Sequence, residues 1–437
     1  MRLTVIGTGY LGATHAACMA ELGHEVIGVD VDADKIAALG AGRVPFHEPG
    51  LGELLRRHLD SGRLRFTTSY EEAGAFGEVH FVCVGTPQSR RSDAADLRYV
   101  DAAFAAIARH AEPGALLVGK STVPVGTARR LADAHPVDVA WNPEFLREGF
   151  AVQDTLRPDR LVFGVESARA EELLREVYAP VLGAGTPLVT ADFPTAELVK
   201  TAANAFLATK ISFINAMAEV CEVAGGDVSV LAEAIGHDDR IGPKFLRAGV
   251  GFGGGCLPKD IRAFAHRAEE LGAPLAFLRE VDAINMRRRE RVVELARELC
   301  GGPGRSVMGA RIAVLGAAFK PDSDDIRDSP ALNVAARLQL DGADVTVYDP
   351  EAMDNARKAF PLLGYALSAR EALHRADVVL HLTEWAEFRA LDPAQVRHWV
   401  SRPRIVDGRG ALDPAAWAAS GWDFRGLGRP PGGEGKR

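Results

Sequence analysis

Residues 2–12 read RLTVIGTGYLG, and this stretch decides the first part of the fold. A short β-branched run leads into Gly7, Gly9 and Gly12, a helix-like pattern follows over residues 13–23, and a second apolar run ends at Asp30. The order is that of a strand, turn, helix and strand. Glycines at this spacing let a pyrophosphate approach the backbone at a helix N-terminus, and an acid about 20 residues further on suits a ribose hydroxyl. The stretch therefore predicts a dinucleotide site.

Asp30 also indicates which dinucleotide binds. Its carboxylate would repel a 2′-phosphate, and no arginine directly follows it. A merely tight turn between strand and helix would not need this acid. We therefore expect NAD rather than NADP.

Further along the chain, the same alternation of strand and helix patterns continues and then changes. Strand-like runs such as EVHFVCVGTP and RLVFGV follow to about residue 190, a long helical pattern begins at Pro194, and the strand–helix alternation restarts at ARIAVLG. The predicted fold is α/β, with two Rossmann-like doubly wound domains joined by a long central helix and a helical dimerisation domain. The expected divisions are residues 1–192 (dinucleotide binding), 193–301 (central helical), 302–425 (second Rossmann-like domain) and 426–437 (a disordered tail).

Composition excludes several classes of function. The 437 residues have a formal net charge of −8 and no long basic or apolar run, so we expect neither a nucleic-acid nor a membrane partner. The five cysteines are far apart, which argues against a disulfide framework and a zinc site. Because the N-terminus enters a strand rather than a signal-peptide core, the expected location is the cytoplasm.

One cysteine has a chemically distinctive setting. Cys256 lies in GVGFGGGCLPKD (249–260), behind five glycines and just before a helix-like segment. The glycines are expected to leave its thiol open to a substrate, and a helix N-terminus favours the thiolate. Asp260, one turn further on, has the spacing of a base acting near the sulfur. These features favour a nucleophile over the usual inert core cysteine.

Other polar residues stand out in the helical and C-terminal parts. Lys200 and Asn204 are one helical turn apart among apolar neighbours, which suggests a buried helix and a partner for the lysine. In the second α/β region only Gly316 remains of the glycine fingerprint, so a second dinucleotide is not expected. Lys320 and Arg327 follow a strand there, where they are equally consistent with phosphate binding and with a solvated charged loop.

Taken together, these segments resemble a known family. GTGYLG with Asp30, VGTP, KSTVPVGT, NPEFLREG, the helix with Lys200 and Asn204, GFGGGCLPKD, FKPDSDDIRDSP and DGR occur in the order seen in the nucleotide-sugar 6-dehydrogenases, the UDP-glucose/GDP-mannose dehydrogenase family. The chain departs from the family pattern at Gly255, where serine is common, at Leu257, where phenylalanine is usual, and at Gly410, where a polar residue is common.

The resemblance implies a role for each matching residue. Cofactor contacts are expected at Gly7, Gly9, Gly12, Asp30, Lys35, Thr86, Thr122, Glu148 and Arg327. Substrate contacts are expected at Phe145, Leu146, Lys200, Asn204, Arg240, Phe245, Gly253, Lys320 and Arg409, with Arg240 lent to a neighbouring subunit. The catalytic set is Cys256, Lys200, Asn204, Asp260, Glu144 and Thr122, with Cys256 as the nucleophile and Glu144 or Asp260 as the base for hydrolysis.

The resemblance also implies a reaction and partners. The expected chemistry is an NAD-dependent, four-electron oxidation of the C6 hydroxyl of a nucleotide-activated hexose through a cysteine thioester, with UDP-glucose as the expected substrate and dTDP-glucose or GDP-mannose as alternatives. A homodimer without a metal is expected. Two other classes stay open at this point: a two-electron NAD dehydrogenase without a covalent intermediate, and a non-catalytic sensor of NAD and nucleotide sugar.

Overall fold

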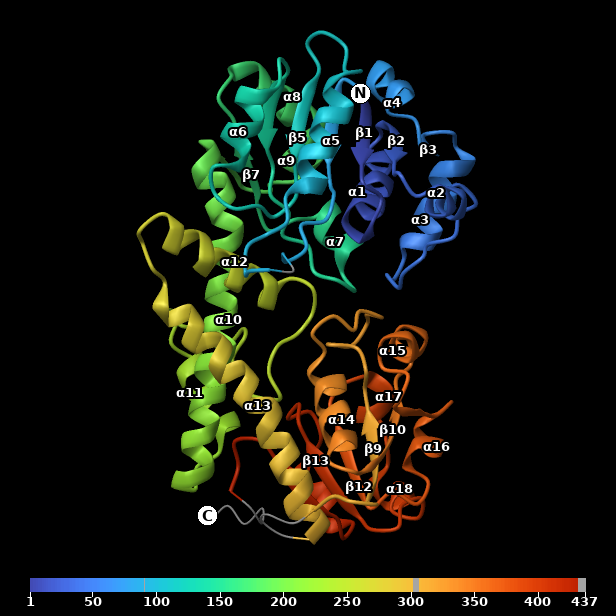
Figure 1. The fold of residues 1–437 in the computed structure, drawn as a ribbon, viewed down its shortest axis with the longest axis vertical. Helices are drawn as coiled ribbons and strands as arrows, with labels where there is room; N and C mark the ends of the chain where they lie inside the picture. Colours follow the sequence, from blue (N-terminus) through green and yellow to red (C-terminus); the bar gives the residue numbers. More distant parts are fainter. Residues whose placement is uncertain (90, 302–305, 431–437) are drawn as a thin grey trace. The chain divides into compact units, whose positions relative to one another are not determined.

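The computed structural model describes residues 1–89, 91–301 and 306–430, which divide into two compact units (Figure 1). The N-terminal unit comprises Met1–Ala203 with Arg262–Pro274, and the C-terminal unit comprises Asn204–Ile261 with the chain from Leu275 onward. Helix α10 (Phe193–Ala224) begins in the first unit and continues into the second. The predicted long central helix is therefore confirmed, whereas the division at residues 192 and 301 stays a prediction.

The N-terminal unit is built on one sheet of eight strands in its described residues. The strand order is β3-β2-β1-β4-β5-β6-β7-β8, and it reverses between β1 and β4. The strands are β1 (Arg2–Ile6), β2 (Glu25–Val29), β3 (Leu64–Thr67), β4 (Val79–Val82), β5 (Leu116–Gly119), β6 (Asp138–Trp141), β7 (Leu161–Gly164) and β8 (Leu188–Ala191). In an open sheet of this kind, ligands bind outside the carboxyl ends of the strands at the point where the order reverses.

Helices cover both faces of this sheet. They are α1 (Tyr10–Glu21), α2 (Ala33–Gly40), α3 (Leu51–Asp60), α4 (Tyr70–Phe76), α5 (Arg98–Ala108), α6 (Thr127–Ala134), α7 (Ala151–Leu156), α8 (Ala168–Val177) and α9 (Ala179–Gly183). Because side chains alternate along a strand, Leu116 and Val118 of β5 join the core that contains α1, whereas Leu117 joins the opposite core with Phe104 of α5. The sheet is therefore doubly wound, as predicted.

Strand β7 departs from the parallel arrangement that is typical of a doubly wound sheet. It pairs antiparallel with β6, through Trp141 and Gly164, and parallel with β8. A parallel connection needs a crossover, which is usually a full helix packed on the sheet. The connection from β6 to β7 carries only the six-residue helix α7, so the chain re-enters the sheet in the opposite direction.

The C-terminal unit contains a second sheet of six parallel strands within the described ranges. Its order, β11-β10-β9-β12-β13-β14, repeats the order of the first six strands of the other sheet. The strands are β9 (Arg311–Leu315), β10 (Asp344–Tyr348), β11 (Gly364–Tyr365), β12 (Val378–His381), β13 (Arg404–Asp407) and β14 (Asp423–Gly426). The second predicted Rossmann-like domain is confirmed.

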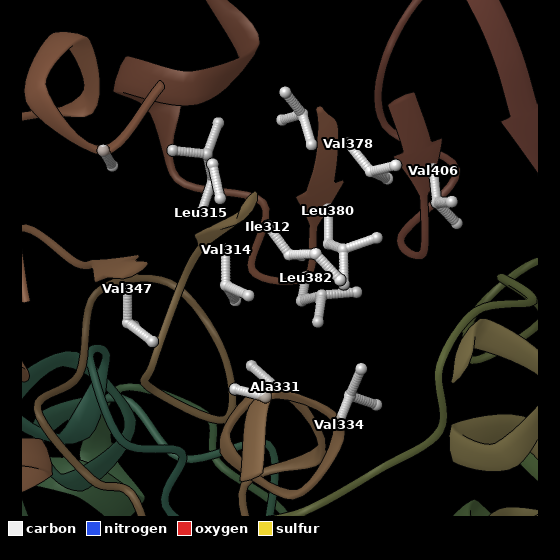
Figure 2. Close-up of a cluster of buried hydrophobic side chains, with 14 of the residues drawn as sticks. Ile312, Val314, Leu315, Ala331, Val334, Val347, Val378, Leu380, Leu382 and Val406 are labelled. Carbon is white, nitrogen blue, oxygen red and sulfur yellow. The ribbon is translucent and has the colours of Figure 1, made fainter. Parts of the chain in front are cut away.

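Besides the later part of α10, the C-terminal unit contains further helices. They are α11 (Val228–Gly236), α12 (Leu257–Glu270, which crosses the unit boundary), α13 (Ala276–Gly301), α14 (Pro330–Leu340), α15 (Met353–Ala359), α16 (Ala369–Leu373), α17 (Ala386–Arg389), α18 (Pro393–Val396) and α19 (Pro414–Ala419). Figure 2 shows the core that results, where Ala331 and Val334 of α14 meet strand residues such as Val314 and Val347.

The chain after β14 is held within the C-terminal unit. The N–H of Gly428 donates to Glu222 Oε1 (2.8 Å), its carbonyl accepts from the N–H of Val228 (3.0 Å), and Arg429 donates to Ser229 Oγ (3.0 Å). Residues 426–430 of the predicted disordered tail are described: Gly426 ends β14, and Gly428 and Arg429 have fixed partners. Residues 431–437 lie outside the described residues.

The described residues offer neither a membrane-spanning helix nor a metal-binding cluster. No helix there is long and apolar enough to cross a membrane. No group of three or more His, Cys, Asp or Glu side chains in the same residues could hold a metal ion.

Candidate functional site

The glycines of the turn after β1 permit close packing and leave space at the N-terminus of α1. Gly7 adopts φ 87°, a conformation that favours glycine, and a Cβ at Gly12 would lie 1.8 Å from the carbonyl oxygen of Gly7. Gly9 is the N-cap residue of α1, and a Cβ placed on it would meet no atom within 4 Å. Two glycines thus permit close packing, and the third leaves space beside the N-terminus of a helix, where a phosphate is stabilised.

Asp30 lies at the end of β2 and is held in its ionised form. Its Oδ2 accepts from the N–H of Thr8 (2.9 Å) and from Lys35 Nζ (2.9 Å), and its Oδ1 accepts from the N–H of Asp32 (3.1 Å). Burial raises the pKa of Asp30, but these hydrogen bonds and the Lys35 charge outweigh burial and leave the pKa below its ordinary value. Lys35, which is expected near the cofactor, thus forms a hydrogen bond with Asp30, the candidate for ribose binding.

The other cofactor candidates of this unit follow neighbouring strands. Thr86 comes after β4 and Thr122 after β5, and the Thr86 hydroxyl donates to the Thr122 carbonyl (2.8 Å). The half-buried Glu148 lies in the loop before α7, which Glu48 holds by accepting from the N–H groups of Gly149 (2.7 Å) and Ala151 (2.8 Å). The carboxyl ends of the parallel strands therefore carry all of these residues.

Glu144 is anchored on both carboxylate oxygens. Its Oε1 accepts from the N–H groups of Phe145 (2.7 Å) and Leu146 (3.0 Å), and its Oε2 lies 3.1 Å from Nζ of the buried Lys120. These contacts hold the carboxylate and the turn after it in one arrangement. The interaction with Lys120 was not predicted.

Lys120 is itself surrounded by polar partners. It donates to Asn142 Oδ1 (3.0 Å) and to the Tyr178 hydroxyl (3.4 Å) as well as facing Glu144. Burial lowers the pKa of Lys120, but the charge of Glu144 and the proximity of Tyr178 raise it by more, so the ammonium form is retained. Lys120 stands in the quoted motif KSTVPVGT, yet no feature of the sequence shows that its partners are residues 142, 144 and 178.

Lys200 is half-buried rather than buried. Its Nζ lies 5.6 Å from the centre of the Phe145 ring, and the guanidinium of Arg160 lies 3.8 Å from the same ring. The predicted substrate-side residues Phe145 and Lys200 are therefore neighbours. The apolar surroundings that suggested a buried helix are partly exposed, since Phe206 is 66% accessible.

Cys256 is exposed and immediately precedes α12 in the C-terminal unit. The first helical turn forms as the N–H of Asp260 donates to the Cys256 carbonyl (2.8 Å). The buried Asp260 side chain accepts from Asn204 Nδ2 on Oδ2 (2.7 Å) and from Lys259 Nζ on Oδ1 (2.6 Å). The structure thus brings three predicted catalytic residues, Cys256, Asp260 and Asn204, to one place.

The other cysteines differ from Cys256 in their surroundings. All five lie in the described part of the chain, none is in a disulfide, and Cys18, Cys83 and Cys221 are buried while Cys300 is half-buried. Burial raises the pKa of all four of these thiols, to about 12 for Cys83. The protonated thiol is favoured at each of the four, as expected for structural cysteines.

The glycines before Cys256 serve a purpose that was not predicted. Residues 251–254 are buried, because the loop packs tightly on its own unit. A Cβ would lie 2.4 Å from Asn285 Oδ1 at Gly251, 2.4 Å from the Asp328 carbonyl at Gly253, and 2.2 Å from the Arg327 guanidinium at Gly255. The thiol is open as expected, but the glycines permit close packing rather than access.

Arg409 connects three segments of the C-terminal unit. It donates to the carbonyls of Leu382 (2.6 Å), Phe319 (2.8 Å) and, less closely, Gly251 (3.3 Å), and it faces Glu384 at 3.4 Å. Burial lowers the pKa of Arg409, although Glu384 and Asp407 oppose this. These contacts tie the residue after β13 to the Cys256 loop.

Lys320 and Arg327 lie in the loop after β9. Lys320 is half-buried with its Nζ 5.5 Å from the Phe319 ring, and Arg327 is exposed and pairs with both oxygens of Asp325 (2.9 and 2.6 Å). The loop approaches the cysteine segment, since the N–H of Gly254 donates to the Arg327 carbonyl (2.8 Å).

The last two candidates, Arg240 and Phe245, are exposed. Arg240 forms an ion pair with Asp238 (2.6 Å), and Phe245 is 42% accessible with φ 63°, a conformation that is uncommon for a bulky residue. Their placement leaves both side chains accessible to a ligand or a second chain.

Comparison with known proteins identifies the family. Models of the UDP-glucose/GDP-mannose dehydrogenase family match three segments: the NAD binding domain over residues 1–182, the central domain over 194–287 and the UDP binding domain over 313–414. The chain belongs to the UDP-glucose/GDP-mannose dehydrogenase family. The glycine turn and Asp30 lie in the NAD-binding segment of this family, so the predicted cofactor is confirmed, and Cys256 lies in the central segment.

Individual members of the family match along their whole length. The chain is 44% identical to a UDP-glucose 6-dehydrogenase of Rhizobium meliloti strain 1021, over 98% of this chain and all of that protein. It is 41% identical to a UDP-glucose 6-dehydrogenase of Pseudomonas aeruginosa, over 99% and 98% of the two chains. The solved UDP-glucose dehydrogenase of Pyrobaculum islandicum superposes with a TM-score of 0.90 at 39% identity, over 98% of each chain.

Proposed function

We propose that this chain oxidises the C6 hydroxyl of UDP-glucose to a carboxylate, with two NAD per sugar, and so produces UDP-glucuronate. One observation carries the proposal: an exposed cysteine at the start of α12 stands beside Asp260 and its partners Asn204 and Lys259, in a chain with an NAD-binding and a UDP-binding segment. The relatives named UDP-glucose 6-dehydrogenase favour this sugar over the alternatives dTDP-glucose and GDP-mannose.

The first oxidation needs a proton acceptor and a hydride acceptor. When bound, NAD would supply the acceptor for the hydride that leaves C6. Asp260 and Lys200 are proposed to accept the hydroxyl proton through water, which gives an aldehyde. Asn204 supports this role because its amide fixes the Asp260 carboxylate. Thr122, which follows β5 in the NAD-binding unit, is proposed to take part in this first oxidation.

The second oxidation depends on the sulfur. The Cys256 thiolate adds to the aldehyde carbon, the oxygen takes up a proton, and the product is a thiohemiacetal. A second hydride then leaves C6 for a second NAD, the hydroxyl proton is lost, and a thioester remains. Lys200 and Asn204 are proposed to stabilise the negative oxygen of the tetrahedral states, and removal of one such donor commonly lowers a rate by about 10²–10³-fold.

Hydrolysis of the thioester completes the reaction. Water adds to the carbonyl carbon, the carbon–sulfur bond breaks, and the thiolate of Cys256 is restored with release of the acid. Glu144 or Asp260 is proposed to take the proton from water. The backbone N–H groups of Phe145 and Leu146, which donate to its carboxylate, and the Lys120 ammonium give Glu144 a fixed position for this step.

The binding residues complete the proposal. Gly7, Gly9, Gly12, Asp30, Lys35, Thr86, Glu148 and Arg327 are proposed to bind NAD, and Phe145, Leu146, Arg240, Phe245, Gly253, Lys320 and Arg409 to bind the nucleotide sugar. A cytoplasmic location belongs to the same proposal, because a reducing compartment preserves the thiol of Cys256.

A homodimer is also proposed, on the basis of one face of α10. Phe206, Phe213 and Val220 are spaced seven residues apart and are 66%, 48% and 57% accessible, and Val223 is 92% accessible. A seven-residue spacing places side chains along one side of a helix, and an exposed apolar stripe of this kind is typical of an interface. We propose that this face packs on the same face of a second copy.

Replacement of the nucleophile tests the reaction. Cys256→Ser should retain NAD and UDP-glucose binding but stall at or before the acyl stage, because a serine hydroxyl stays protonated and is a weaker nucleophile than a thiolate, and an alkoxide is a poorer leaving group. Product analysis by mass spectrometry and NADH absorbance measure this outcome. Full acid production by Cys256→Ser would remove the covalent step.

The ratio of NADH to sugar distinguishes the remaining function classes. The proposal expects two NADH per UDP-glucose, with slower turnover of dTDP-glucose and GDP-mannose. A single NADH would indicate a two-electron dehydrogenase, and binding of both ligands without NADH would indicate a sensor.

A further inference from the structure

The segment before Cys256 depends on its surroundings for its shape. Residues 249–255 contain five glycines, which lose more backbone freedom on folding than other residues. Hydrogen bonds from outside the segment supply the order: the N–H of Gly249 donates to Asn215 Oδ1 (2.8 Å), and the N–H of Gly254 donates to the Arg327 carbonyl (2.8 Å). Between these two anchors lies Phe252.

Phe252 is held on both backbone groups by one side chain. Its N–H donates to Asn285 Oδ1 (2.7 Å), and its carbonyl accepts from Asn285 Nδ2 (2.9 Å). Asn285 is fully buried in the middle of α13 and therefore pairs with Phe252 as a neighbouring strand would. The contact joins residues that lie 33 positions apart in the sequence.

The surrounding packing enforces the same arrangement. A Cβ at Gly251 would lie 2.4 Å from Asn285 Oδ1 and 3.0 Å from the Asn285 carbonyl, so the loop lies directly against α13. One helical turn further, the buried Arg289 donates to the Phe252 carbonyl (3.2 Å) and pairs with Asp328 (2.7 Å). The carbonyl of Phe252 thus receives two donors from one helix.

Few residues separate Phe252, which Asn285 and Arg289 hold, from the thiol of Cys256. Only Gly253, Gly254 and Gly255 separate Phe252 from Cys256, and none of the three has a side chain that could anchor the loop independently. Their backbone is packed closely against Asp328, Phe319 and Arg327, so a shift of Phe252 would be passed along this packed backbone to the sulfur. A displacement of about 1 Å at a reacting group can lower a rate by about 100-fold.

We propose that Asn285 is a positioning residue for Cys256: through Phe252 it holds the thiol where it can reach the sugar carbon. The inference rests on the proposed function, because it assigns Asn285 to the steps in which the sulfur takes part. Loss of the amide should therefore slow the second oxidation and thioester hydrolysis more than the first hydride transfer.

Asn285→Ala tests this, with Ser212→Ala as a matched control. The Ser212 hydroxyl is buried and donates to the Val281 carbonyl of α13 (2.7 Å), one turn from Asn285, so its removal also deletes a buried hydrogen bond between a side chain and the same helix region. We expect Asn285→Ala to lower the rate of the second oxidation by about 10–100-fold, with unchanged NAD affinity. Iodoacetamide should alkylate Cys256 more slowly in this variant, or UDP-glucose should no longer protect Cys256 from alkylation. Ser212→Ala should keep the wild-type rates.

The controls separate this inference from the proposed function. Full acid production by Cys256→Ser would refute the function itself, whatever Asn285→Ala does. If Cys256→Ser stalls as expected, the inference is overturned by wild-type rates in Asn285→Ala, or by an equal loss in Ser212→Ala at an equal fall in melting temperature. In the Cys256→Ser background, Asn285→Ala should leave the first hydride transfer unchanged. If Asn285→Ala does not fold, Asn285→Ser takes its place, with a smaller loss expected from its remaining hydroxyl.

Discussion

At the scale of single residues, His15 shows how burial sets the behaviour of an ionisable group. It lies in α1 with no exposed surface, and its ring meets Phe81 edge-on at 4.6 Å. Neither ring nitrogen has a hydrogen-bond partner among the described residues. Burial lowers the pKa of His15 well below its ordinary value, and the nearby Lys120 charge lowers it further. The folded chain therefore keeps His15 neutral.

We predict that His15→Leu stabilises the protein, most strongly in acid. A histidine with a lowered folded pKa stays neutral in the fold but takes up a proton in the unfolded chain below about pH 6.5, so stability is lost as the pH falls, by up to about 1.4 kcal/mol per pH unit. Leucine removes both this loss and the unpaired ring nitrogens. We expect the free energy of unfolding to rise by about 1–3 kcal/mol. Melting temperatures at pH 7 and pH 5 measure it. A variant with the same pH dependence as wild type would contradict the prediction.

Residue types in a local pattern were enough to predict part of the site. Gly7, Gly9, Gly12 and Asp30 could be read from spacing alone, because strand, turn and helix N-terminus are formed by neighbours in sequence. The roles of Lys120 and Asn285 could not be read from the sequence, because the role of a lysine or an asparagine depends on the distant group that it contacts. Residue 120 meets residues 144 and 178, and residue 285 meets residue 252.

At the scale of elements, the loop from Gly249 to Cys256 acts as one packed unit. Each glycine faces a different neighbour, and the neighbours differ in rigidity: Gly251 faces the backbone and side chain of Asn285 in α13, whereas Gly255 faces the flexible end of the exposed Arg327 side chain. Substitutions at the two positions should therefore have different consequences.

We predict that Gly251→Ala lowers stability and activity, whereas Gly255→Ser mainly affects cofactor binding. Gly251 has φ 97° and no space for a Cβ, so alanine should destabilise the fold by about 1–3 kcal/mol. Serine at position 255, the residue common in the family, should displace the Arg327 guanidinium at little cost in stability. If Arg327 binds NAD as proposed, the KM for NAD should change while the melting temperature does not. Equal melting temperatures for the two variants would refute the difference in rigidity.

The elements also show where periodicity is informative. The long helix expected from Pro194 is α10, Phe193–Ala224, and it ends just before the glycine pair 225–226. The helix expected after Cys256 is α12, which begins at Leu257. The antiparallel direction of β7 could not be read in this way, because a strand pattern has the same period in both directions.

At the scale of the whole molecule, the exposed face of α10 raises the question of assembly. Phe213 lies in the middle of this face and is half-exposed in the single chain, so a charge there should not disturb the core of the C-terminal unit. In a dimer built on this face it would be buried without a partner, which is strongly unfavourable.

We predict that Phe213→Asp weakens or abolishes the dimer. Size-exclusion chromatography with light scattering should give a dimer for wild type and a monomer, or a strongly concentration-dependent mass, for the variant. Leu367→Asp is the matched control, since Leu367 is 80% accessible and lies in a segment before α16, and it should remain dimeric. A monomeric wild type, or a dimeric Phe213→Asp, would refute the proposed interface.

The sequence by itself determined the two α/β regions, the long helix between them, the NAD fingerprint and the cysteine before a helix, because each depends on groups close together along the chain. Only the tertiary structure decided that Glu144 is anchored by Lys120, that the glycines pack rather than open the loop, and that Asn285 holds Phe252. The Glu144–Lys120 and Asn285–Phe252 contacts join residues that lie 24 and 33 positions apart, and such contacts leave no periodic trace in either segment. Their physical basis is the geometry of the packed unit, which exists only after the chain has folded.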